Sequence, residues 1–232
     1  MSAVPERSNR ALLAPYALPY LLYVGLAAVP ESWIGREPSY GLRIVVCGAA
    51  LAWAWRFYVP LRGPGRIAGS LGWGAVVGLA GAALWIGLLA PFVPPTGAPW
   101  GGGAFALRLV AAGTVVPLFE ELLLRGYVLR LAVQWDRARA AGRPEPLAEV
   151  FDRQSIADVE PGAWTPLALA VATLLFAAGH LTYEWPAALG YGLLMGGLWI
   201  VRKDLLSCVV AHAVTNVALA VYVRAAGAWQ LW

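Results

Sequence analysis

Two adjacent glutamates and an arginine stand inside an apolar stretch of the sequence, in the run Pro117-Leu-Phe-Glu-Glu-Leu-Leu-Leu-Arg125. An ionisable side chain at the centre of a membrane costs about 2.5–3.5 kcal/mol on insertion scales, so such residues are rare and mostly functional. Glu121 and Arg125 are four residues apart and share a helix face, where their charges compensate each other. Glu120 points about 100° away on a helix and has no such partner. A carboxylate in that position could act as a general base.

Both histidines of the chain also lie in apolar stretches, and each belongs to a pair with a four-residue spacing. Phe176 and His180 form one pair, and His212 and Asn216 form the other, so each pair shares a helix face. A neutral imidazole can orient water or accept a proton. An asparagine amide can donate to a developing oxyanion, which is worth about 2.7–4 kcal/mol in kcat. Together these residues could form a hydrolase that uses water directly, without a serine or cysteine nucleophile.

Each pair has a plainer interpretation when it is taken alone. Glu121 and Arg125 could be a structural ion pair, and His180 could be a satisfied core residue. His212 with Asn216 could link two helices through a hydrogen bond. The joint occurrence favours an active site, because the only acids deep in apolar stretches and both histidines fall into these three spaced pairs.

The composition is that of a membrane protein. Hydrophobic residues make up 60% of the 232 residues and charged residues 13%, whereas soluble domains are about 25% charged. The mean hydropathy is +0.65. The net charge of +4 comes from basic residues in short segments between apolar stretches, so we expect a membrane partner and no nucleic acid. The fold class predicted is an all-α, polytopic membrane helix bundle with a polar cavity.

We expect about seven (7–8) transmembrane helices, since a membrane span needs about 20 apolar residues. The apolar stretches cover residues 11–29, 40–59, 68–92, 104–130, 164–183, 186–201 and 205–223. Together they form a single domain, 1–232, whose motif-bearing core is about 104–220. A polar segment at about 132–161 is expected to be a cytoplasmic loop. It is interpreted as a solvated connector, with part of it able to lie on the membrane as an amphipathic helix.

The distribution of basic residues predicts a cytoplasmic N-terminus. In that orientation the cytoplasmic segments carry twelve basic residues and the outer segments four. The twelve are Arg7, Arg10, Arg56, Arg62, Arg66, Arg130, Arg137, Arg139, Arg143, Arg153, Arg202 and Lys203. The four are Arg36, Arg43, Arg108 and Arg224. We also expect the polar cavity to open toward the cytoplasm, and the excess of arginine over lysine suits an integral protein of a bacterial inner membrane.

Three motifs in this order resemble those of a known family. The chain is similar to the CAAX protease and bacteriocin-processing (CPBP, Abi) family of intramembrane endopeptidases, which includes the Ras-converting CAAX endopeptidase. The family carries EExxxR, FxxxH and HxxxN motifs, which match Glu120-Glu121 with Arg125, Phe176 with His180, and His212 with Asn216. The size and the Trp/Arg-rich early loops also resemble the CAAX-protease-related proteins that accompany exosortase systems.

The resemblance implies a role for each matching residue. Glu120 would activate water, with His180 helping to hold or deprotonate it. His212 and Asn216 would stabilise the oxyanion. The supporting residues would be Glu121 and Arg125, which brace the site, and Phe176, which packs against it. The substrate would be a peptide or a protein. In one form of this hypothesis the substrate is associated with the membrane or carries a lipid.

Other functions remain open at this point. A metalloprotease could bind zinc through Glu120, His180 and His212, although the local HExxH signature is absent. The leading hypothesis uses no cofactor. Buried ionisable residues also occur in proton-coupled transporters. A third alternative is a non-catalytic immunity or scaffold protein with the same fold.

Overall fold

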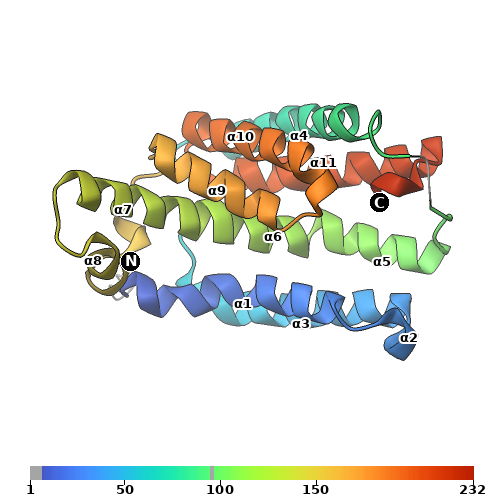
Figure 1. Cartoon of the computed structure of the whole chain (residues 1–232), viewed down its shortest axis with the longest axis horizontal. Helices are drawn as coiled ribbons and strands as arrows, with labels where there is room; N and C mark the ends of the chain where they lie inside the picture. The colour runs from blue at the N-terminus through green and yellow to red at the C-terminus, as the bar shows by residue number, and fades with distance from the viewer. Residues whose placement is uncertain (1–6, 95–96) are drawn as a thin grey trace.

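The computed structural model describes residues 7–94 and 97–232, which are mostly helical and contain no strand (Figure 1). The helices are α1 (Asn9–Ala27), α2 (Glu31–Ile34), α3 (Arg36–Ala54), α4 (Ile67–Leu89), α5 (Gly102–Gly113), α6 (Val115–Glu121), α7 (Leu129–Ala140), α8 (Pro146–Arg153), α9 (Pro166–Ala178), α10 (Trp185–Arg202) and α11 (Leu205–Ala226). The all-α membrane bundle is confirmed.

Each of the seven predicted stretches contains a helix, but not every helix has the length and hydropathy of a membrane span. Four segments of the described chain do: α1, α4, the run from Gly102 to Ala140, and α11. The apolar helix α9 has only 13 residues. The charges of Arg36, Glu37 and Arg43 lower the hydropathy of α3. A helix was therefore predicted correctly in each of the seven stretches, and four segments of the described chain qualify as spans by length and composition.

The segment from Gly102 to Ala140 carries both candidate carboxylates and is not one regular helix. At Thr114 the backbone leaves helical geometry (φ −130°, ψ −80°), which separates α5 from α6. Residues Leu122–Val128 then form a π-helix that joins α6 to α7. π-helical turns are rare and occur frequently at functional sites. The irregular winding therefore marks the part of the segment that contains Arg125.

Close approach of α4 and α11 depends on glycine. A Cβ atom added at Gly74 would lie 2.7 Å from the Val210 side chain, and one at Gly78 would lie 2.6 Å from the carbonyl oxygen of Ala211. Neither position has room for a side chain. The GxxxG pattern on α4 therefore serves packing within the chain. This contact fixes α11, which carries His212.

A second glycine pair brings α10 against α9. Cβ atoms at Gly192 and Gly196 would lie 2.9 Å and 2.2 Å from side-chain atoms of Thr173 and Leu169, respectively. This GxxxG pattern also packs within the chain. Helix α9 begins at Pro166, after Thr165 caps the backbone N–H of Ala168. Packing and capping together place the C-terminal end of α9 beside the start of α10.

The polar segment predicted at residues 132–161 differs from the expectation. Its first part continues α7 to Ala140, because it is rich in helix-forming residues such as alanine, glutamine and arginine. The rest folds back onto α1 and α7, and the side chains of Val150 and Ile156 are fully buried. A solvated connector therefore describes only residues 139–149, most of which are exposed. The part that follows is docked on the protein.

Asn9 holds this segment in place from inside the fold. Its Nδ2 donates to the side-chain oxygen of Gln134 (2.8 Å) and to the Val150 carbonyl (2.9 Å), and its Oδ1 accepts from the Ile156 backbone N–H (2.6 Å). The Asn9 residue is 0% exposed. Next to it, Arg10 forms an exposed ion pair with Asp152 and lowers the pKa of the Asp152 carboxyl group, chiefly through a hydrogen bond.

Candidate active site

The four residues predicted to be catalytic line one pocket. The pocket has a volume of about 300 Å³ and lies among α5, α6, α9, α10 and α11. Glu120, His180, His212 and Asn216 all contribute to its lining, as does Phe176. Stretches separated by up to 96 positions therefore meet, as the three motifs require. The pocket contains the polar groups that a water-dependent hydrolysis would need.

Glu121 is fully buried and holds two other residues of the set. Its Oε1 accepts hydrogen bonds from Arg125 (3.0 Å) and from Nδ1 of His212 (2.9 Å). The side chains of Glu121 and Arg125 are 0% and 1% exposed. Arg125 also donates to the carbonyl oxygen of Gly192 on α10 (3.3 Å). The predicted ion pair therefore exists, and it links α6, α10 and α11.

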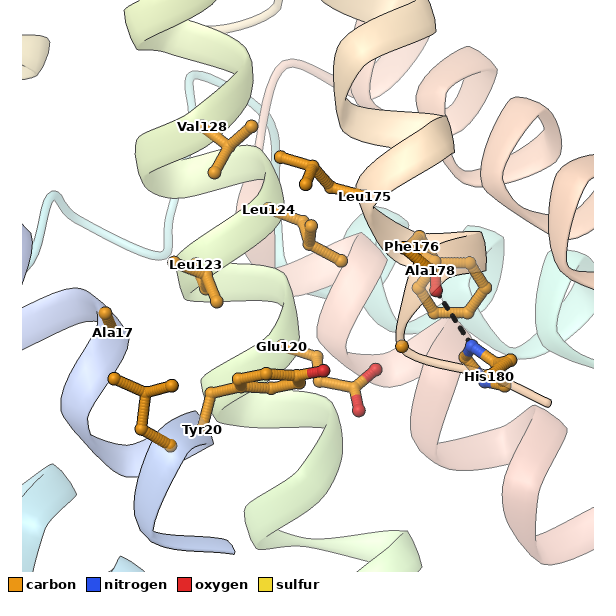
Figure 2. Close-up of a pocket in the computed structure, with 12 residues that line it drawn as sticks. Ala17, Tyr20, Glu120, Leu123, Leu124, Val128, Leu175, Phe176, Ala178 and His180 are labelled. Carbon is orange, nitrogen blue, oxygen red and sulfur yellow. Dashed lines mark hydrogen bonds between the residues drawn. The ribbon is translucent and has the colours of Figure 1, made fainter. Parts of the chain in front are cut away.

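Glu120 has a different environment from its neighbour. Its side chain is 16% exposed, and its Oε2 lies 3.8 Å from Nε2 of His212. That distance is longer than a hydrogen bond, and a single water molecule could bridge the two atoms. Figure 2 shows the Glu120 carboxylate directed toward His180 across the space between α6 and the end of α9. The first glutamate thus faces the cavity, and the second faces the protein interior.

His180 lies beyond the end of its helix. The apolar pattern predicted a helix over 164–183, but α9 ends at Ala178. The Nδ1 atom of His180 lies 2.8 Å from the carbonyl oxygen of Phe176, one of the last carbonyls of the helix (Figure 2). A carbonyl oxygen only accepts, so Nδ1 carries the proton, and Nε2 of a neutral ring can accept one. The Phe176 ring packs 4.6 Å from the His180 ring.

Asn216 follows His212 by four residues on α11, and a hydrogen bond fixes its side chain. Its Nδ2 donates to the carbonyl oxygen of Ala112 on α5 (2.8 Å). An amide nitrogen has two N–H groups, so one donor remains for a ligand in the pocket. The hydrogen bond fixes the plane of the amide, which is what a preorganised oxyanion donor needs.

Two further residues of the pocket were not identified from the sequence. The Tyr191 hydroxyl donates to Oγ1 of Thr215 (3.2 Å), which donates to the Gly78 carbonyl on α4 (2.8 Å). The Tyr191 ring lies 5.7 Å from that of His212. Thr215 follows His212 by three residues, so helical spacing could have indicated it. Nothing in the local sequence distinguishes Tyr191 from the other tyrosines.

An apolar groove meets the pocket at its Glu120 side. It has a volume of about 350 Å³ and runs between α1, the π-helix and α9 (Figure 2). Tyr20, Leu124 and Leu175 are among its lining residues. Glu120 and His180 belong to both the groove and the pocket. An apolar chain lying in the groove would therefore end beside the candidate catalytic residues.

The pocket lies nearer to the opposite end of the bundle from the one predicted. Its lining includes Trp85 near the end of α4, Leu219 in the second half of α11 and Trp232, which follows that helix. The ends of α4 and α11 lie away from α8 and from the start of α1 (Figure 1). The expected opening toward the side of residues 132–161 is therefore not supported by this lining, because α9 ends early and His180 follows it.

The residues proposed as an alternative zinc site do not form a complete ligand set. Within residues 7–94 and 97–232, no three His, Cys, Asp or Glu side chains are arranged so that they could hold a metal ion. His212 uses Nδ1 for Glu121, so only Nε2 could bind a metal.

The comparison with protein families gives one match. The family model described as "Type II CAAX prenyl endopeptidase Rce1-like" matches residues 102–218. This range contains all three motifs and the residues that bring them together. No curated protein and no solved structure matches the chain.

Proposed function

Since the chain belongs to the Rce1-like family of type II CAAX prenyl endopeptidases, we propose that it is an intramembrane endopeptidase that hydrolyses a peptide bond with a water molecule activated by Glu120. The observation that supports this most is the shared pocket of Glu120, His180, His212 and Asn216. The residues come from three separate segments, and each presents an unsatisfied donor or acceptor to the same space.

In the proposed reaction, Glu120 accepts a proton from water while the water oxygen attacks the carbonyl carbon of the substrate. His180 holds the water through Nε2, the nitrogen that its bond to Phe176 leaves unprotonated. The carbonyl oxygen becomes an oxyanion. When the carbon–nitrogen bond breaks, Glu120 returns the proton to the leaving amine, so the carboxylate is regenerated.

The oxyanion would be stabilised by the free N–H of Asn216 and by Nε2–H of His212. Because Nδ1–H of His212 is already donated to Glu121, the second donor requires a doubly protonated ring. The carboxylates of Glu121 and Glu120, on opposite sides of the ring, would face that positive charge. Glu121 and Arg125 act here as positioning residues, since neither lines the pocket.

The apolar groove suggests which part of the substrate lies beside the reacting bond. The groove side chains are mainly aliphatic and reach Glu120 and His180 at one end. Such a surface fits an apolar peptide segment or a lipid chain, and burial of either would contribute about 25 cal/mol per Å² of apolar area. We therefore propose a membrane-associated substrate with an apolar portion next to the cleaved bond.

The test is cleavage in cells that contain the wild-type protein or its Glu120→Gln variant. Comparative proteomics of membrane-protein termini should find termini that disappear with Glu120→Gln and persist with Glu160→Gln, a change at an exposed loop residue. Both variants must insert and fold to the same extent. Full activity of the purified Glu120→Gln protein would rule out the mechanism. Proton flux or partner binding without cleavage would instead favour a transporter or a scaffold.

The zinc alternative has its own test. Purified protein is analysed for bound metal, treated with a chelator and then assayed with and without added zinc. The water mechanism predicts that the treated protein keeps its activity. Loss of activity that zinc restores, together with loss of bound zinc in His180→Ala, would establish the metalloenzyme instead.

A further inference from the structure

The pocket and the arginine-rich segments lie at opposite ends of the bundle. Trp85 and Trp232 line the pocket at the end where α4 and α11 finish, and Leu219 lines it from the second half of α11. Residues of α8 and the segments that join α3 to α4 and α10 to α11 lie at the other end, with the start of α1 (Figure 1). The two features therefore belong to different sides of any membrane that the bundle spans.

The charges identify which end is cytoplasmic. Twelve basic residues occur at the end that contains α8, and four at the end that contains the pocket. The segments that carry them are short, so the excess of basic residues determines orientation. Several of the twelve are strongly exposed: the side chains of Arg10, Arg139 and Arg143 are 68%, 59% and 58% exposed. Moving them across a bilayer would be costly.

Three of the four basic residues at the pocket end are less available to oppose this orientation. Arg36 forms two hydrogen bonds with Glu31, at 2.9 and 2.8 Å. Arg43 is 8% exposed and donates to the hydroxyl of Ser39. Arg108 lies between the rings of Trp100 and Trp232, 5.0 and 4.4 Å from their centroids. Aromatic rings around an arginine are common at a membrane–water interface.

We infer that the pocket opens on the non-cytoplasmic face of the membrane, so that the substrate is a protein segment exposed on the outer side. The substrate part of this inference rests on the proposed protease function, and the orientation part does not. The scissile bond of such a substrate reaches Glu120 and His180 after translocation. Proteins whose apolar anchor remains in the outer leaflet fit this geometry, because the groove leads to the same two residues.

Orientation is tested with single cysteines and a membrane-impermeant maleimide. The native thiols of Cys47 and Cys208 are 0% exposed, so the wild-type protein provides the background. Ala140 and Ala226 form a matched pair, since each is an exposed alanine at the last position of its helix. Ala226→Cys should react in spheroplasts, and Ala140→Cys only in inverted vesicles. Leu219→Cys, in the pocket lining, should follow Ala226→Cys.

The reverse pattern, or equal labelling of both positions from one side, would overturn the inference. If either variant fails to accumulate, the adjacent exposed alanines Ala225 and Ala141 replace the pair. The second measurement uses the new protein termini that are found with the wild-type protein and are missing with Glu120→Gln. They should map to outer segments of membrane or exported proteins, and cytoplasmic termini would contradict the proposed substrate class. Absence of any such termini would contradict protease function, whereas the labelling result would stand.

Discussion

Nδ1 of His212 lies 2.9 Å from Oε1 of Glu121, so the second glutamate of the pair fixes an imidazole that lines the pocket. The same carboxylate oxygen accepts from Arg125. Glu120, one residue earlier, makes no hydrogen bond among the described residues and faces the cavity. Under the proposed mechanism, the adjacent carboxylates therefore have separable functions, one structural and one chemical.

This separation predicts different effects of the same substitution at the two positions. Glu121→Gln leaves the buried charge of Arg125 without a counter-charge, which should cost about 3–5 kcal/mol of folding free energy. Glu120→Gln should change stability little, because Glu120 has no arginine partner and is partly exposed. Thermal unfolding of both purified variants in the same detergent measures the contrast. Equal losses of Tm would show that the two carboxylates are not distinguished in this way.

Close packing of α4 on α11 predicts that a single methyl group at Gly78 is harmful. Its Cβ would lie 2.6 Å from a backbone oxygen of α11, so the helices must separate, at a cost of about 1–3 kcal/mol. Gly72→Ala is the matched control, because Gly72 lies on the same helix with nothing within 4 Å of its Cβ. That variant should be neutral or slightly more stable, since alanine favours helix. The Tm values of the purified Gly78→Ala and Gly72→Ala variants are compared, and equal values would contradict the packing argument.

The network around Asn9 predicts that one buried amide secures the segment after α7. Asn9→Ala removes the side-chain hydrogen bonds to Gln134, Val150 and Ile156. It should lower the free energy of unfolding by about 1–3 kcal/mol. Arg10→Ala removes only an exposed ion pair, worth about 0–1 kcal/mol. Hydrogen exchange of residues 150–159 should accelerate in the first variant and remain near wild type in the second. Unchanged exchange in Asn9→Ala would mean that other contacts hold the segment.

The groove in Figure 2 predicts that filling it lowers activity without unfolding the protein. Ala178 is exposed and lines the groove, so Ala178→Trp should occupy the space beside His180. Ala170→Trp places the same side chain on an exposed part of α9 outside the groove. We expect a fall in kcat/KM of about tenfold or more for the first variant, equivalent to about 1.4 kcal/mol. Equal activity of the two variants would exclude the groove from substrate binding.

The sequence predicted the helices and the members of the pocket because both leave local patterns. Apolar length indicates a helix in a membrane, and deep ionisable residues are rare enough to be informative. The end of α9 was missed because the apolar pattern continues past Ala178, while the His180 ring bonds back to the Phe176 carbonyl. Long-range partners leave no such pattern. The hydrogen bonds of Asn9 join residues up to 147 positions apart and could not be inferred from spacing.

The π-helix between Leu122 and Val128 has a consequence for the chain on either side of it. Its turns contain more residues than α-helical turns, so it changes the angular phase of α7 relative to α6. Glu121 can therefore point at α11 while Arg130 and Gln134 point at the docked segment after α7. Removing one of these seven residues would let the helix wind regularly. The side chains of Arg130 and Gln134 would then rotate relative to Glu121, and the two sets of contacts could no longer form together.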